Sequence, residues 1–263
     1  MNQEKKDILN EIFDMDFIDS FLDYEDCFSN NRFYHYLKGE TCKKFIDTFS
    51  KRDNCFLDAG AGRGPYTKLA TTKFNKVLCF EYNQSELERA KINLTNLSNI
   101  LFQKVDLTDI PLNDNSIDAA ICSEVLEHIP DNKKAISEIY RVMKPGSSLL
   151  ISMPNSNSLL YWPSKIKNRK LLKQGEKAWE EKGCWERLRH LYFTPSKIES
   201  LVKDAGFNIT KKYGAYIVRI PHGPRKFLMK DFPFLFKYLV KIDRSLGNII
   251  PELGAFYFLT LKK

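Results

Sequence analysis

A glycine-rich segment contains the residues of this sequence whose types and spacing best suit ligand binding. It reads Asp58-x-Gly60-x-Gly62-x-Gly64, directly before a helix expected from Pro65. Glycines let the backbone approach a ligand closely, and a helix start offers unpaired N–H groups. The GxGxG spacing departs from the GxGxxG of dinucleotide sites. Because Asp58 suits an ammonium group better than a pyrophosphate, we expect a ligand with a cationic group.

Two further carboxylates follow the next two expected strands. Glu81 ends the strand Val77 to Glu81, and Asp106 follows the strand Ile100 to Val105. A carboxylate at the first position can accept both hydroxyls of a ribose, and one at the second can accept an adenine amino group. Each carboxylate alone could cap a helix or lie in a solvated turn. Three acidic positions at three successive strand ends together indicate a nucleoside site.

A parallel sheet is needed to bring these strand ends together. From Asn54 onward, short β-rich runs alternate with helical patterns, which is typical of a doubly wound α/β sheet. The expected strands are 55–58, 77–81, 100–105, 117–122, 149–153, 207–213 and 255–261, with an antiparallel edge hairpin at the end. Lys144-Pro145-Gly146 is expected to end the helix that starts at Asp131.

The domain organisation follows from this order of elements. We expect residues 1–50 to form an N-terminal helical cap over the site, and residues 51–263 to form one ligand-binding domain. Residues 154–190 and 215–253 interrupt the alternation of strands and helices. They are polar, basic and aromatic without clear periodicity, so the sequence predicts irregular insertions there.

Several segments of this sequence resemble those of the class I S-adenosylmethionine (SAM)-dependent methyltransferase superfamily. The resemblance is to the type 11 group in particular, which includes ubiquinone-biosynthesis methyltransferases. The segments that carry the resemblance are 56–64, 80–82, 105–107, 110–118, 123–128, 141–146, 189–195 and 205–207. The resemblance implies a Rossmann-like seven-stranded fold with SAM as the cofactor. It also implies that the two insertions outside the shared pattern choose the substrate.

The resemblance assigns a part of the cofactor to each candidate residue. It implies that Asp58, Gly60, Ala61 and Gly62 lie at the methionine end and that Glu81 holds the ribose. It further implies that Tyr82 flanks the adenine, that Asp106 and the Leu107 amide hold the adenine edge, and that the backbone of Cys122 or Ser123 meets the amino-acid moiety.

The segment Glu124-Val125-Leu126-Glu127-His128 follows the fourth expected strand, at the sheet edge where ligands bind in such folds. Methyl transfer from a sulfonium is an in-line displacement, in which the enzyme aligns the reactants and removes a proton where the nucleophile requires it. His128 is the expected general base, because an unperturbed imidazole titrates at about pH 6.5. His222 is a weaker alternative.

The same segment has a second interpretation as a metal site. In ubiquinone O-methyltransferases and small-RNA 2′-O-methyltransferases, an ExxEH segment and a later histidine resemble a divalent-metal site. Here the ligands of a Mg²⁺-type ion would be Glu124, Glu127, His128 and His190. Similar segments occur in relatives that need no metal, and Glu127 and His128 can equally brace the following helix. We therefore favour the interpretation without a metal.

The net charge of +8 is concentrated in two segments. Residues 161–190 hold nine Lys/Arg against four Asp/Glu, and residues 211–244 hold nine against two, with aromatic residues between them. Such segments suit an anionic membrane surface or an anionic, partly apolar acceptor. They could also bind nucleic acid, or form a helical cap with solvated lysines. We rank a lipid-linked or other small acceptor above RNA, since no RNA-binding module is recognised.

These observations lead to a functional prediction. We expect a methyltransferase that acts on a hydroxyl, or alternatively an amine, of a small, lipid-like or saccharide acceptor. A 2′-O RNA methyltransferase and a catalytically silent SAM-binding scaffold are the alternatives. The polar start at Met1 to Glu11, the lack of a membrane-spanning apolar run and six scattered cysteines predict a cytoplasmic protein. Peripheral association with a membrane would be compatible with this.

Overall fold

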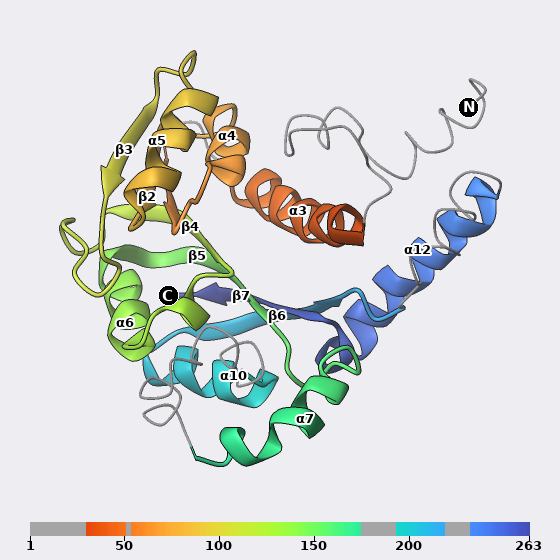
Figure 1. The fold of residues 1–263 in the computed structure, drawn as a ribbon. Coiled ribbons are helices and arrows are strands. Elements are labelled where there is room, and N and C mark those ends of the chain that lie inside the picture. The colour runs from red at the N-terminus through yellow and green to blue at the C-terminus, as the bar shows by residue number, and fades with distance from the viewer. Residues whose placement is uncertain (1–29, 51–53, 175–192, 219–231) are drawn as a thin grey trace.

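Seven strands form one sheet in the computed structural model, which describes residues 30–50, 54–174, 193–218 and 232–263 (Figure 1). The strands are β1 (Cys55–Ala59), β2 (Lys76–Glu81), β3 (Ile100–Lys104), β4 (Ile117–Ser123), β5 (Met143–Pro154), β6 (Asn208–Ala215) and β7 (Phe256–Lys262). Their order is β3-β2-β1-β4-β5-β7-β6. The pairs among β1 to β5 are parallel, and β7 is antiparallel to both β5 and β6. The predicted doubly wound, mostly parallel sheet is confirmed.

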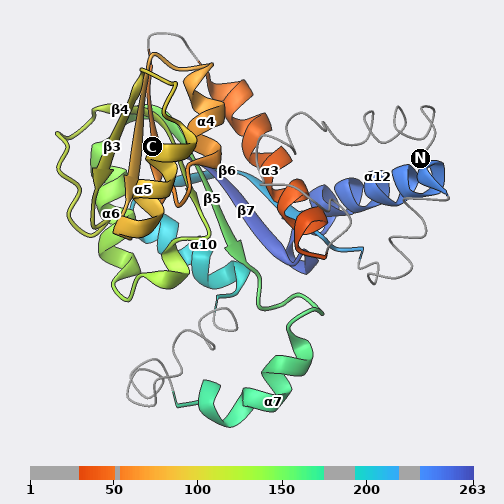
Figure 2. The same ribbon diagram turned by 45° about the horizontal axis from the view of Figure 1, so that its top comes forward.

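Helices cover both faces of this sheet (Figures 1 and 2). One face packs against α6 (Asn132–Val142) and α10 (Pro195–Asp204). The other packs against α3 (Asn30–Phe49), α4 (Pro65–Thr71), α5 (Gln84–Asn93) and α12 (Pro233–Ile249). The central strands are buried on both faces, as Phe56 and Leu57 show with no exposed surface. Burial on both faces explains their continuous apolar sequence.

Two helices lie where the sequence predicts irregular structure. They are α7 (Trp162–Leu172), inside the segment 154–190, and α12, inside the segment 215–253. The prediction of irregular structure is therefore wrong for these residues. Every residue of α7 is described and none is buried, so no apolar face of this helix packs against the sheet. In α12, apolar residues recur with a helical period, and some of them also lie on the exposed side.

The predicted breaker segment lies at the start of a strand instead of in a loop. α6 ends at Val142, and β5 begins at once with Met143. The register of β5 against β4 shifts beside this point, and Gly146 has a φ of 79°. A bulge thus accommodates Pro145 and Gly146, which is where strands tolerate these residues.

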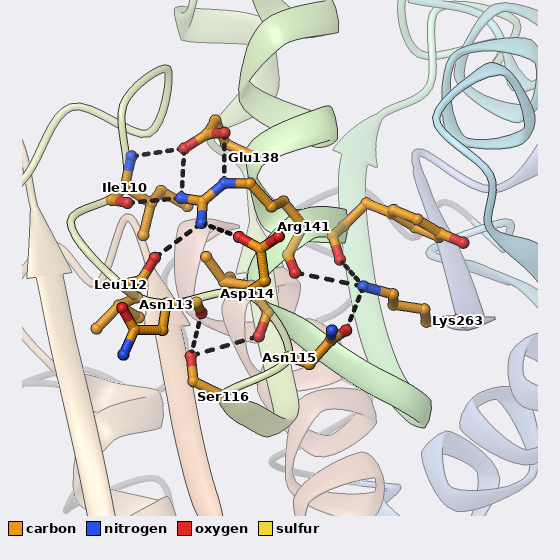
Figure 3. A network of polar contacts seen from close by, with 11 residues as sticks. Ile110, Leu112, Asn113, Asp114, Asn115, Ser116, Glu138, Arg141 and Lys263 are labelled. Atoms are coloured by element: carbon orange, nitrogen blue, oxygen red, sulfur yellow. Dashed lines mark hydrogen bonds and ion pairs between the residues drawn. The ribbon is translucent and has the colours of Figure 1, made fainter.

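A polar network fixes the chain where it enters β4 and β5 (Figure 3). The Arg141 guanidinium donates to both carboxylate oxygens of Glu138 at 2.8 Å and to Asp114 Oδ1 at 2.7 Å. It also donates to the carbonyls of Ile110 and Leu112. The hydrogen bond from Arg141 holds the pKa of Glu138 below its ordinary value. Two segments that carried the family resemblance, 110–118 and 141–146, therefore meet in a contact that positions strands.

Candidate active site

A cavity of about 1360 Å³ lies at the carboxyl ends of the parallel strands. Its walls come from the segments 60–66 after β1, 80–83 after β2, 105–108 after β3 and 123–131 after β4, together with Lys38 of α3. The strand order reverses between β1 and β4. A crevice at this reversal is where open α/β sheets bind ligands, so the strand ends named from the sequence do converge.

The glycine-rich loop forms the floor of this cavity beside β4. The N–H groups of Gly60 and Ala61 donate to the Phe80 carbonyl at 2.8 and 2.9 Å, which fixes the loop against β2. A Cβ on Gly60, whose φ is +83°, would overlap the Val125 side chain. Gly62 has a φ of +55° and open space where a Cβ would lie. Gly60 thus permits close packing of the loop on the segment after β4, and Gly62 leaves room in the cavity.

Glu81 holds the glycine-rich loop and the start of α5 together. Its Oε2 accepts a hydrogen bond from the Gly62 N–H at 2.8 Å, and its Oε1 accepts one from the Asn83 N–H at 2.8 Å. Asn83 in turn caps α5 through its side chain. A carboxylate offers about four acceptor sites. Glu81 can therefore accept further hydrogen bonds from a ribose while it orders the loop.

Residues that suit an adenine ring line the neighbouring wall. Tyr82 is 67% exposed, and the Lys104 ammonium lies 5.8 Å from the centre of its ring. Asp106 accepts from the Thr108 N–H at 2.9 Å and from its hydroxyl at 2.8 Å, both through Oδ1. Leu107 also lines the cavity. An exposed ring and a carboxylate next to each other can stack on and bind the edge of a flat base.

The segment after β4 forms the opposite wall. Glu124 has a φ of +59° and its N–H donates to the Ser152 carbonyl at 2.9 Å. Its carboxylate accepts from the Ser152 hydroxyl at 3.4 Å, and burial raises its pKa. His128 ends the short 3₁₀ helix η1 (Leu126–His128), and its side chain is 42% exposed. A proton acceptor thus lies in the same cavity as Glu81.

The comparisons with known proteins agree with this geometry. A family model described as a methyltransferase domain matches residues 57–151, which include the glycine-rich loop, Glu81, Asp106 and His128. Residues 57–151 form a class I, type 11 methyltransferase domain. Two curated relatives are each 30% identical to the chain. One is a demethylmenaquinone methyltransferase of Clavibacter sepedonicus, aligned over 36% of the chain and 39% of the relative. The other is a ubiquinone/menaquinone biosynthesis C-methyltransferase of Marinomonas, aligned over 40% and 46%.

The chain spans less than half the length of these two relatives. Solved structures resemble it over more of its length. A SAM-dependent methyltransferase from Aquifex aeolicus covers 84% of the chain and 88% of its own length, with a TM-score of 0.52 and 16% identity. The [4+2]-cyclase SpnF covers 85% and 80%, with a TM-score of 0.57 and 18% identity. At such identities the two structures show a shared fold.

Two predicted cofactor residues lie behind the cavity wall of the methyltransferase domain. Asp58 is 1% exposed, and its Oδ2 accepts from the Thr67 hydroxyl of α4 at 2.7 Å. Cys122 is fully buried, whereas its neighbour Ser123 lines the cavity. Asp58 therefore ties the end of β1 to α4 through Thr67. The other predicted cofactor residues, Gly60, Ala61, Gly62, Glu81, Tyr82, Asp106, Leu107 and Ser123, line the cavity.

The buried Asp58 carboxyl makes stability depend on pH. Burial raises its pKa to about 7 in the folded protein, whereas the pKa of an aspartate in an unfolded chain is about 3.9. Between these values the folded state binds the extra proton, so the free energy of unfolding falls as pH rises, by up to about 1.4 kcal/mol for each pH unit. We expect Asp58→Asn to remove this contribution. Urea unfolding of both proteins across the window checks it, and equal slopes would contradict it.

The candidate metal ligands divide between the cavity and the core. Glu124 and His128 line the cavity, but Glu127 is fully buried and does not. Within the described residues, no group of three or more ligand-type side chains is arranged to hold a metal ion. His190, the fourth member of the set, and His222, the alternative base, lie outside those residues.

Sequence reasoning did not name several side chains that line the cavity, and two of them are Lys38 and Tyr66. Lys38 reaches the cavity from α3, and Tyr66 reaches it from the first turn of α4. Lys38 lowers the pKa of Glu124 through its charge, although burial of Glu124 has the larger, opposite effect. The position of Tyr66 directly after Pro65, at the expected helix start, was the one available signal. Lys38 had none, because its place depends on how α3 packs.

Proposed function

We propose that the protein transfers the methyl group of SAM to a hydroxyl, or alternatively an amine, of a small lipid-like or saccharide acceptor. One observation carries this proposal. One cavity is lined by the residues that suit a nucleoside, Gly62, Glu81 and Asp106, and also by the polar residues Ser123, Glu124 and His128. A donor bound at the first set of residues and an acceptor bound at the second would meet in the same cavity. An in-line displacement requires such an arrangement.

SAM supplies a sulfonium-bound methyl group, which leaves as the acceptor oxygen forms its new C–O bond and the C–S bond breaks. The protein binds and orients the donor through Glu81 and the glycine-rich loop. The His128 imidazole takes the proton of the acceptor hydroxyl. Its Nε2 lies 3.8 Å from Oε1 of the buried Glu127. The Glu127 carboxyl is thus placed beside the imidazole and can orient its ring.

His128→Ala is expected to lower turnover about a hundredfold, because the variant lacks the general base. Affinity for S-adenosylhomocysteine should stay unchanged. The assay measures S-adenosylhomocysteine release with a panel of phenols, amines, saccharides, lipid quinols and RNA, and calorimetry measures binding. Lys133→Ala, an exposed change on the following helix, is the matched control. Full activity of His128→Ala would remove His128 from the mechanism.

The curated relatives favour a second candidate acceptor. The Marinomonas relative is named as a C-methyltransferase of ubiquinone and menaquinone biosynthesis. On that basis a quinol ring carbon would be the acceptor, and NMR of the product would distinguish a new C–CH₃ group from O–CH₃. Conversely, the resemblance to a structure named as a [4+2]-cyclase shows that this fold alone does not prove methyl transfer. Cofactor binding without turnover on any acceptor would favour the silent scaffold.

A further inference from the structure

Two helices outside the matched domain expose apolar side chains beside cations. On α7, Trp162 and Ile166 are 63% and 52% exposed. On α12, Phe234 is 62% exposed, and Leu235, Tyr238 and Ile242 are each close to half exposed. We call these six residues, with the exposed Lys167, Arg169, Lys170 and Lys241, the basic apolar surface, which is divided between two separate helices. Single exposed apolar residues are ordinary, whereas rows of them along a helix mark binding surfaces.

The exposed side of α12 belongs to a helix whose inner side is firmly held. Asp243 is 2% exposed and accepts from the Val218 N–H at 2.7 Å and from the Tyr216 N–H at 3.1 Å. Arg244 forms an ion pair of 2.8 Å with Glu40 of α3. Gly247 packs so closely on Gly214 that a Cβ would overlap its carbonyl. The apolar row therefore faces outward because the opposite face of the helix is fixed to β6 and α3.

The positive charge of the basic apolar surface indicates which kind of partner can bind it. α7 contains Lys165, Lys167, Arg169 and Lys170, and its sequence has no Asp or Glu. The only acidic residue of α12 is Asp243, which is buried. A second copy of this surface would bring like charges together, which disfavours self-association. An anionic lipid headgroup layer complements the cations, and the boundary below it accepts Trp, Tyr, Phe and Leu side chains.

Both helices leave the sheet at the edge where the cavity lies. β5 runs into α7 at its carboxyl end, and α12 returns into β7 through the short helix η3 (Pro251–Leu253) at the same edge. The Asn155 side-chain amide joins the two exits, since it donates to the carbonyls of Glu252 and Gly254 at 2.6 and 2.7 Å. Figures 1 and 2 show α7 set apart from the sheet and α12 projecting outward beside β6.

We propose that the basic apolar surface docks the protein on an anionic phospholipid membrane. None of the helices in the described part of the chain has the length and apolarity to cross a bilayer, so the contact would be peripheral. Docking does not rest on the proposed methyl transfer. It would, however, bring a lipid-dissolved acceptor to the edge of the sheet that carries the cavity.

Flotation of the full chain with vesicles tests this proposal. We expect recovery with phosphatidylcholine vesicles that contain about one third phosphatidylglycerol, and little recovery with phosphatidylcholine alone. Lys167→Glu/Lys170→Glu should weaken binding at least about tenfold, since each cation near such a surface contributes about 1 kcal/mol. The control Lys76→Glu/Lys262→Glu makes the same charge change at exposed positions on the opposite edge of the sheet and should bind as the wild type does.

A second pair of variants tests the apolar contribution. Trp162→Ala/Ile166→Ala should reduce vesicle binding, whereas Ile92→Ala/Leu101→Ala, which truncates exposed apolar residues on α5 and β3, should not. Equal binding to neutral and anionic vesicles would overturn the proposal. So would loss of binding in both charge variants alike, or salt-sensitive retention on RNA without vesicle binding, or a dimer that the surface variants dissociate. Cofactor binding measured on the same samples tests the proposed function separately.

Discussion

Glu81→Ala is expected to weaken S-adenosylhomocysteine binding by about a thousandfold, from the loss of two charge-assisted hydrogen bonds at about 2 kcal/mol each. The carboxylate would accept the ribose hydroxyls and already holds the Gly62 and Asn83 N–H groups. Its removal therefore takes away ligand acceptors and loosens the loop that shapes the cavity. Isothermal titration calorimetry on the purified variant measures the change.

Two further variants separate these contributions of Glu81. Glu81→Gln keeps one acceptor oxygen and replaces the other with a donor, so we expect a smaller loss than in Glu81→Ala. Glu88→Ala removes an exposed carboxylate from α5 that pairs with Lys91, and cofactor affinity should not change. Thermal unfolding confirms that each variant is folded. An unchanged affinity in folded Glu81→Ala would place the nucleoside elsewhere and defeat the proposed function.

The sequence was sufficient to predict that Glu81, Asp106 and the glycine-rich loop meet at one edge of the sheet. Glu81 and Asp106 lie at the ends of parallel strands, and the carboxyl ends of such strands meet at one edge whatever the details of packing. The glycine-rich loop is equally local, because its positive φ angles and its helix start are properties of a few adjacent residues. Both features depend on short-range geometry that a strand–turn–helix pattern already specifies.

The rest of the cavity depends on packing between distant elements, which a single sequence does not reveal. Lys38 faces the cavity because apolar residues of α3, such as Leu37 and Phe45, pack in the core cluster shared with α4. Asp58 fits the expected pattern, yet its carboxylate is buried, accepts from the Thr67 hydroxyl of α4 and does not line the cavity. α12 was not predicted, although its apolar residues recur with a helical period.

Gly60→Ala is expected to cost about 3 kcal/mol of unfolding free energy and to abolish measurable cofactor binding. A methyl group there would overlap the Val125 side chain, and the φ of +83° is strained for any residue with a Cβ. Overpacking costs about 1–3 kcal/mol and the left-handed conformation about 1–2 kcal/mol. Urea unfolding and calorimetry measure the two effects.

The neighbouring glycine and the neighbouring valine provide the controls for this substitution. Gly62→Ala adds the same methyl group into open space at a φ of +55°, so only the strain of about 1–2 kcal/mol should appear. Gly60→Ala/Val125→Ala should recover the overpacking part and leave the strain, which a double-mutant cycle isolates. Val125 lies between Glu124 and His128 in the segment after β4. The clash in Gly60→Ala should therefore also displace this segment, and turnover should fall further than in Gly62→Ala. Equal losses in the two glycine variants would show that the loop and this segment are not coupled through Val125.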